Sequence, residues 1–238
     1  MSVSPGLQVS GLNGWYGPAH ILFDVGFEAR PGEVVALLGR NGAGKSTTFK
    51  AIVGLLAKRA GRITFGGQDV SRAPSYAVAR AGLGYVPEDR RVFTELTVEE
   101  NLEVGRQKPR AGAPTWTPER LYALFPNLGA MRGRLGGRMS GGEQQMLTIA
   151  RTLMGNPSLV LLDEPSEGLA PKIVEDMALA IRELKREGLS IVLSEQNLHF
   201  AKLIADKAVV LERGRVRFAG TIAELDAAPD IRDAYLAV

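Results

Sequence analysis

The sequence contains no cysteine among its 238 residues. Disulfide scaffolds, zinc–thiolate sites and cysteine nucleophiles are therefore excluded. Basic residues hardly outnumber acidic ones, 29 against 26, so the net charge is only +3. This balance does not suggest a dedicated nucleic-acid binder, in which basic residues dominate. Apolar residues make up 45% and charged residues 23%, which is ordinary for a globular domain and rules out disorder of the whole chain.

Long apolar runs are also absent. The longest runs have five or six residues, such as Val34–Leu38, far short of the ~18 that a transmembrane helix needs. The start of the chain, Met1 to Gly6, lacks the basic residues and the apolar run of a signal peptide. We therefore expect the chain to stay in the cytoplasm unless another protein carries it to a membrane surface.

Short runs rich in Val, Ile and Leu alternate with longer amphipathic segments. The runs have the composition of strands buried on both faces of a parallel sheet; they are Val34–Leu38, Leu159–Leu162, Ile191–Leu193 and Ala208–Leu211. Between them apolar residues recur at helical spacing, as they do from Met146 to Met154. The alternation predicts a single domain, residues 1–238, with a doubly wound α/β core.

Two regions depart from this alternation. Residues 1–30 predict an antiparallel β patch, in which strands Leu7–Val9 and Ile21–Ala29 are joined by a glycine-rich bend. Residues 89–144 lack apolar strand runs and contain a capping-box helix start at Thr97. We interpret this second region as a helical subdomain inserted in the α/β core.

Residues 39–46 read Gly-Arg-Asn-Gly-Ala-Gly-Lys-Ser and match the phosphate-loop motif G-x-x-x-x-G-K-[ST]. The match lies between a predicted strand and an apolar-periodic helix, which is the context that the motif requires. Its glycines let backbone N–H groups surround phosphate oxygens, Lys45 would reach the β- and γ-phosphates, and the Ser46 hydroxyl would bind Mg²⁺. The predicted nucleotide-binding residues are Gly39, Arg40, Asn41, Gly42, Ala43, Gly44, Lys45, Ser46 and Thr47.

Two carboxylates, Asp163 and Glu164, follow the apolar run Leu159–Leu162. They would lie at the carboxyl-terminal edge of the parallel sheet, where open α/β sheets bind ligands. A solvated strand end is the alternative, because acids are common there. With the phosphate loop present, we expect Asp163 to hold Mg²⁺ and Glu164 to polarise the attacking water as the catalytic base.

A second glycine turn, formed by Ser140, Gly141 and Gly142, precedes another helix. Ser140 and Glu143 form a capping-box pattern, so a well-capped helix is the simple interpretation. Two glycines directly after the cap also expose N–H groups at a positive helix end, which favours anion binding.

At this point the sequence resembles the ATP-binding subunits of ABC transporters. Met139–Glu143 is similar to the Leu-Ser-Gly-Gly-Gln motif of that family, and the order of motifs agrees along essentially the whole chain. The resemblance implies a P-loop NTPase fold of the ABC ATPase type, with ATP and Mg²⁺ as cofactors. It also implies a head-to-tail dimer, in which ATP lies between the Lys45 loop of one chain and the second glycine turn of the other. Tyr16 matches the aromatic residue that stacks on adenine, with Trp15 as its rival.

Two positions differ from most of the family. Glu88 replaces a glutamine, and as a carboxylate it would ligate Mg²⁺ more strongly than an amide. Gln196 replaces a histidine near the γ-phosphate; it donates a hydrogen bond but does not titrate near neutral pH. We assign Gln196 with Lys45 and Glu164 to catalysis. The alternative is that both replacements only weaken the site.

These differences resemble one branch of the family, the second ATPase of branched-chain amino-acid importers. The matching stretches are Val86–Glu88, Glu195–Asn197, Leu169–Pro171 and Arg232–Leu236. The branch implies a sister ATPase, in a homo- or heterodimer, two transmembrane permease subunits and, indirectly, a periplasmic binding protein. It implies no nucleic acid, and a place at the cytoplasmic face of the inner membrane.

Other functions remain open on the sequence. They are an ATPase of a lipid or polysaccharide exporter, a soluble ABC ATPase of DNA repair or translation, a phosphate-loop kinase, and a subunit that binds ATP without hydrolysing it. For a transport subunit we expect residues 88–99 to receive a membrane subunit, with Phe93 and Leu96 as exposed apolar contacts.

Overall fold

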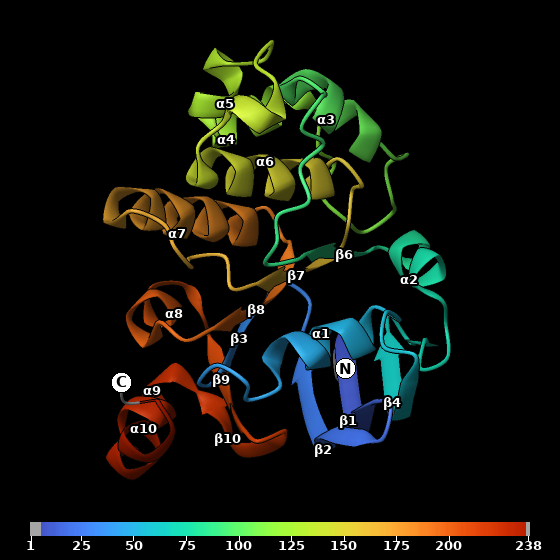
Figure 1. Cartoon of the computed structure of the whole chain (residues 1–238), viewed down its shortest axis with the longest axis vertical. Coiled ribbons are helices and arrows are strands. Elements are labelled where there is room, and N and C mark those ends of the chain that lie inside the picture. The colour runs from blue at the N-terminus through green and yellow to red at the C-terminus, as the bar shows by residue number, and fades with distance from the viewer. Residues whose placement is uncertain (1–5, 237–238) are drawn as a thin grey trace.

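The computed structural model describes residues 6–236 and contains two sheets (Figure 1). The larger sheet has six strands in the order β10-β9-β3-β8-β7-β6. Its strands are β3 (Val34–Leu38), β6 (Leu83–Val86), β7 (Leu159–Asp163), β8 (Ser190–Glu195), β9 (Lys207–Glu212) and β10 (Arg215–Thr221). Only β10 pairs antiparallel, so the prediction of a parallel α/β core is confirmed.

The parallel strands are buried on both faces, as their uninterrupted apolar runs predict. All five residues of β3 are buried. Val34, Ala36 and Leu38 face the core that helices α6, α7 and α8 cover, whereas Val35 and Leu37 face the core shared with α1 and the second sheet. Alternation along one strand therefore joins two hydrophobic cores.

The second sheet has four antiparallel strands in the order β2-β1-β4-β5. They are β1 (Leu7–Tyr16), β2 (Ala19–Ala29), β4 (Lys58–Phe65) and β5 (Gln68–Asp69). The sheet thus extends beyond residues 1–30, and β1 continues past the predicted end at Val9 through both of its glycines to Tyr16. The predicted bend between the two strands lies at Gly17 and Pro18. Gly14 is needed within β1, since a Cβ would lie 2.7 Å from a methyl carbon of Leu56.

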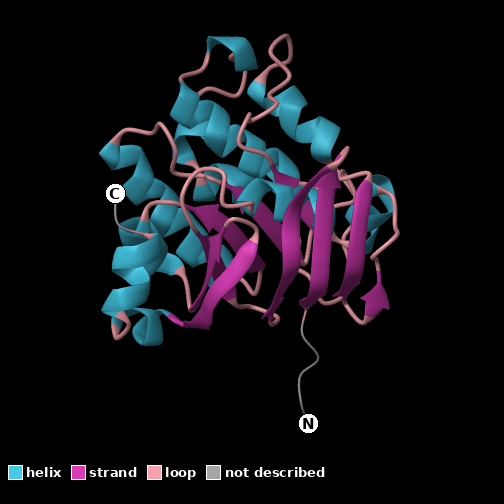
Figure 2. Cartoon of the chain, turned by 60° about the horizontal axis from the view of Figure 1, so that its bottom comes forward, coloured by secondary structure: helices cyan, strands magenta, loops and turns pink. Residues whose placement is uncertain are grey.

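Helices cover the parallel sheet; those from α3 to α7 form the upper part of the molecule in Figure 1, whereas α9 and α10 lie at its lower left. They are α1 (Lys45–Ile52), α2 (Ser75–Ala81), α3 (Val98–Gly105), α4 (Pro118–Leu124), α5 (Pro126–Ala130), the 3₁₀ turn η1 (Gly136–Arg138), α6 (Gly141–Leu153), α7 (Pro171–Arg186), α8 (Leu198–Ile204), α9 (Ile222–Asp226) and α10 (Pro229–Tyr235). Figure 2 shows the antiparallel strands side by side, with most helices gathered above and to the left of them. Within residues 6–236, no helix is both long enough and apolar enough to cross a membrane.

The inserted region consists of α3, α4, α5 and η1, followed by α6. Both predicted capping boxes are present, at Thr97 before α3 and at Ser140 before α6. Helix α6 therefore begins at Gly141, five residues before the apolar periodicity indicates, and it continues past residue 144 into the core. The insertion and the core consequently share one rigid helix.

The turn between β9 and β10 connects the phosphate loop to the antiparallel sheet. Gly214 N donates to Ala43 O at 2.8 Å, and Phe23 N donates to Gly214 O at 2.8 Å. Gly214 has φ +73°, and a Cβ there would lie 1.8 Å from the carbonyl oxygen of Ile21. Only glycine combines this backbone conformation with so close an approach.

We predict that Gly214→Ala destabilises the fold by at least about 2 kcal/mol, through backbone strain and the displacement of β2. Gly32→Ala is the matched control, because Gly32 also has positive φ (+72°) but has open space around its Cβ position. It should cost only about 1 kcal/mol. Denaturant unfolding of the two variants measures the difference, and equal losses would contradict the close contact at Ile21.

Candidate active site

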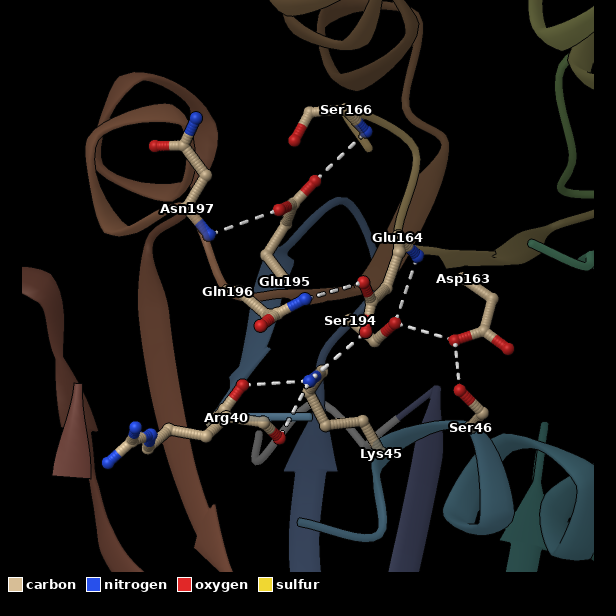
Figure 3. A network of polar contacts seen from close by, with 11 residues as sticks. Arg40, Lys45, Ser46, Asp163, Glu164, Ser166, Ser194, Glu195, Gln196 and Asn197 are labelled. Atoms are coloured by element: carbon tan, nitrogen blue, oxygen red, sulfur yellow. Dashed lines mark hydrogen bonds and ion pairs between the residues drawn. The ribbon is translucent and has the colours of Figure 1, made fainter. Parts of the chain in front are cut away.

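The candidate catalytic residues lie along the carboxyl-terminal edge of the parallel sheet. Parallel pairing sets Leu38 beside Glu195 and Asp163 beside Ser194. The ends of β3, β8 and β7 are therefore neighbours, and the polar segments that follow them meet (Figure 3).

The phosphate loop ends in α1, and its lysine is turned inward. Lys45 Nζ donates to the carbonyl oxygens of Gly39 at 2.7 Å and Arg40 at 3.2 Å, which folds the loop around the ammonium group. Gly44 precedes the helix with φ +106°. The first N–H groups of α1, from Lys45 on, have no carbonyl partner within the helix and provide donors for phosphate oxygens.

Glu164 is held by two of the residues that the sequence assigns to catalysis. Its Oε1 lies 3.1 Å from Lys45 Nζ, and the side chains of this pair are only 7% and 3% exposed. Its Oε2 accepts from Gln196 Nε2 at 3.0 Å. Glu164 also has φ +47°, a costly conformation for a non-glycine residue, of the kind that gathers at functional sites. Lys45, Glu164 and Gln196 thus meet within one chain (Figure 3).

Asp163 is a buried carboxylate, and the side chains that hydrogen-bond it in residues 6–236 are all hydroxyl groups. Its Oδ1 accepts from Ser46 Oγ at 3.0 Å and from Ser194 Oγ at 2.7 Å, and its Oδ2 accepts from Tyr85 at 3.1 Å. Burial and the nearby Asp163 carboxylate raise the pKa of Tyr85, which keeps this phenol a hydrogen-bond donor. Among the described residues no ion pair neutralises Asp163, so the site is open to a cation.

This arrangement fits Mg²⁺. A hydroxyl and a carboxylate, Ser46 and Asp163, offer the oxygen ligands that Mg²⁺ prefers. In the part of the chain that the structure describes, no three acidic or histidine side chains cluster to hold a metal by themselves. Phosphate oxygens would therefore have to complete the coordination, as is usual for this ion.

Glu88 does not join this cluster. It is exposed on the loop after β6, and none of the hydrogen bonds of the described residues connects it to Ser46 or Asp163. Its charge acts instead on Glu167, whose N–H donates to Glu164 O at 3.2 Å. A role of Glu88 as a magnesium ligand stays a prediction.

The pKa values of Glu164 and Glu167 are shifted in opposite directions. Burial by itself would raise the pKa of Glu164, but its hydrogen bond with Glu167 and the charge of Lys45 outweigh burial and lower it. The same hydrogen bond, partial burial and the charges of Glu164, Glu88 and Glu195 raise the pKa of Glu167 to about 7. The candidate base is therefore ionised, and its neighbour carries the proton near neutral pH.

Tyr16 and Trp15 lie on opposite faces of β1. Trp15 stacks on His20 with ring centroids 4.4 Å apart, and Lys58 lies 5.0 Å above the indole ring. His20 is thus a structural residue, which also hydrogen-bonds Asn13 at 3.0 Å. Tyr16 is exposed and shares its face of β1 with Gly14, which packs on Leu22, a neighbour of Gly44. This face is the one that meets the phosphate loop, and it favours Tyr16 over Trp15 as the adenine contact.

The second glycine turn is capped by its own helix. Ser140 accepts from Glu143 N at 3.4 Å and donates its own N–H to the Glu143 carboxylate at 2.7 Å. In residues 6–236, none of its three residues hydrogen-bonds the phosphate loop. The Arg90 guanidinium packs over Gly141, where a Cβ would lie 2.6 Å from Nη1. A larger residue at this position would displace the end of the Arg90 side chain.

Three residues of the site escaped the sequence analysis as functional candidates. Ser194 and Tyr85 bind Asp163, and the Glu195 carboxylate accepts from Ser166 N at 3.0 Å. Ser194 and Glu195 end β8, one strand away from Asp163 in the sheet. Their position at the end of a strand beside β7 was the available signal. His199, on α8, is exposed and takes no part.

Comparison with known proteins agrees with this geometry. The family model described as ABC transporter matches residues 22–167. The chain belongs to the ABC transporter family. ATPase subunits of this family hydrolyse ATP to drive transport and work with membrane permease subunits. The family resemblance of the sequence is confirmed.

Individual relatives of this ABC ATPase are similar over nearly the whole chain. The high-affinity branched-chain amino acid transport ATP-binding protein BraG of Pseudomonas aeruginosa is 43% identical over 97% of the chain and 99% of its own length. The lipopolysaccharide export system ATP-binding protein LptB of Haemophilus influenzae is 33% identical over 93% of the chain and 92% of its own length. MJ1267, an ATP-binding cassette of an ABC transporter, has a TM-score of 0.83 at 26% identity, covering 96% and 98% of the two chains.

The raised pKa of Glu167 predicts that the stability of the fold depends on pH. The pKa of Glu167 is raised from 4.5 to about 7 on folding, so the folded state binds a proton that the unfolded state has lost. The resulting stabilisation is complete below pH 4.5 and is lost as pH rises to about 7. Wild type should therefore lose unfolding free energy relative to Glu167→Gln over this interval, and denaturant unfolding across the range measures it. A difference in unfolding free energy that stays constant across this pH range would contradict the raised pKa of Glu167.

Proposed function

We propose that this chain is the ATP-hydrolysing subunit of an importer for branched-chain or related amino acids. The convergence of Lys45, Ser46, Asp163, Glu164 and Gln196 at one sheet edge carries the assignment of hydrolysis. The similarity to BraG and the four branch-specific stretches of the sequence support the importer. The chain would act at the cytoplasmic face of the inner membrane, beside two permease subunits that receive solute from a periplasmic binding protein.

In this proposal each site residue has one task. Lys45 and the N–H groups of residues 39–47 bind the phosphates, while Ser46 and Asp163 hold Mg²⁺. Glu164 orients and deprotonates the attacking water after the γ-phosphate draws Lys45 away from it. Gln196 keeps Glu164 in place by its amide hydrogen bond. Tyr16 stacks on adenine, and Glu88 approaches the metal only when nucleotide is present.

The active form would be a head-to-tail dimer with a sister ATPase or a second copy of the chain. Ser140 is exposed, and the glycine turn behind it is separated from the phosphate loop of its own chain. Its free N–H groups and the positive end of α6 suit the γ-phosphate of a nucleotide that another subunit holds.

A hollow of about 840 Å³ beside the inserted helices supports docking of a permease. Of the seven large apolar side chains that are exposed in residues 6–236, four line this hollow: Leu55, Tyr76, Phe93 and Val104. Such concentration of exposed apolar area on one surface is typical of a protein interface. Phe93 thus agrees with the sequence-based expectation, whereas Leu96 is half-buried and lies outside the hollow.

The similarity to LptB supports a second candidate, an ATPase of a lipopolysaccharide or lipid exporter. Its catalytic site would be the same, because the difference lies in the membrane subunits. The identity of these subunits therefore separates the two candidates.

We predict that Glu164→Gln lowers ATP turnover by at least about 10²-fold in the assembled complex, because the neutral amide cannot accept a proton from water. Binding of MgATP should persist, since Lys45 and the phosphate loop are intact. Glu175→Gln, an exposed change on α7, is the control and should leave turnover unchanged. Unchanged turnover in Glu164→Gln would instead indicate a subunit that binds ATP without hydrolysing it.

We predict that Tyr76→Asp reduces the recovery of membrane subunits with the tagged chain, because a carboxylate in the apolar hollow is costly to desolvate. Leu179→Asp on α7 is the matched control, since the two side chains are 64% and 61% exposed and only Tyr76 lines the hollow. The measurement is tandem-affinity purification from detergent-solubilised membranes. Recovery of two permeases and a sister ATPase by wild type supports the importer. Lipid-export subunits would support the second candidate, and soluble partners alone would contradict both.

A further inference from the structure

Three consecutive residues at the end of β8 each hold a residue that follows β7 (Figure 3). Ser194 donates to Asp163 at 2.7 Å and accepts from Glu164 N at 3.0 Å. Glu195 accepts from Ser166 N, and Gln196 donates to the Glu164 carboxylate. The segment 194–196 is therefore attached at successive points to the segment that carries the candidate base.

Glu195 is the least expected member of this group. Its carboxylate is 2% exposed and forms no ion pair with any described residue. Burial raises its pKa, and the nearby Glu164 charge acts in the same direction. A buried carboxyl group without a cation costs free energy unless hydrogen bonds compensate for the lost water. We therefore expect hydrogen bonds of Glu195 that a smaller or neutral side chain would not form.

The Glu195 carboxylate provides two acceptors for two different loops. Oε1 accepts from Ser166 N at 3.0 Å, just after the base, and Oε2 accepts from Asn197 N at 3.3 Å, just after Gln196. The main-chain oxygen of Glu195 also accepts from Gly39 N at 3.3 Å, at the start of the phosphate loop. A glutamine has one acceptor oxygen, so it would leave either the buried Ser166 N–H or the Asn197 N–H without this partner.

We propose that Glu195 is a positioning residue for ATP hydrolysis. By clamping the loop after Glu164 to the loop after Gln196, it sets the distance at which the Gln196 amide orients the Glu164 carboxylate. Glu195 touches neither substrate nor water, and it acts through Gln196. The inference deepens the proposed hydrolytic function and depends on it.

A double-mutant cycle tests this inference. The variants are Glu195→Gln, Gln196→Ala and both together, in the assembled transporter, with Glu175→Gln as the exposed control. Glu195→Gln should lower kcat about tenfold or more, because a small displacement of a catalytic group is costly, and should change KM for MgATP by less than about twofold. In the Gln196→Ala background, Glu195→Gln should lower kcat little further, because the residue through which it acts is gone.

The outcomes discriminate between a positioning role and a structural one. Multiplicative losses in the double variant, or a wild-type kcat in Glu195→Gln, would overturn the inference. If Glu195→Gln prevents folding or assembly, Glu195→Asp retains two acceptor oxygens and should restore a kcat between wild type and the Gln196→Ala variant; a kcat below that of Gln196→Ala would overturn it too. Failure of the proposed function is distinct, since it would appear as unchanged turnover in Glu164→Gln.

Discussion

Parallel pairing of β3, β8 and β7 is the constraint on which the site depends. The register places the ends of these strands side by side, so the phosphate loop, the 194–196 segment and the Asp163–Glu164 pair start from neighbouring positions. Each strand is buried on both faces, and a shift of one residue would therefore exchange the two cores as well as misalign the site. The same packing that stabilises the fold fixes the catalytic distances.

The charge balance of the site explains why it would bind a metal–nucleotide complex. Asp163, Glu164 and Glu195 are buried carboxyl groups, and among the described residues Lys45 is the only cation that pairs with any of them. A free nucleotide would add negative charge to a region that already has too much. Mg²⁺ would supply the missing positive charge at Asp163, and the phosphates would take Lys45 from Glu164. The two ligands are therefore expected to stabilise each other in the site.

Much of the fold follows from local patterns, and the errors have physical causes. Val34–Leu38 forms a strand with the predicted bounds, because its apolar run ends at a glycine. Strand β4 was not predicted, since its first half is charged and exposed and only its last residues are buried. The start of α6 follows from the predicted Ser140 capping box, which begins the helix at Gly141, five residues before the apolar periodicity starts at Met146.

The residues of the site also differ in whether local sequence or only tertiary structure reveals their role. The phosphate loop and Asp163–Glu164 are recognisable because their chemistry depends on neighbours in sequence. Glu195 was invisible, since its partners, Ser166 and Gly39, come from strands that only tertiary pairing brings together. The sequence alone also leaves open whether Gln196, in place of histidine, weakens the site. Its hydrogen bond to Glu164 places a neutral donor beside an ionised base. Such a donor holds the carboxylate without competing for its proton, so the replacement is consistent with a working catalytic site.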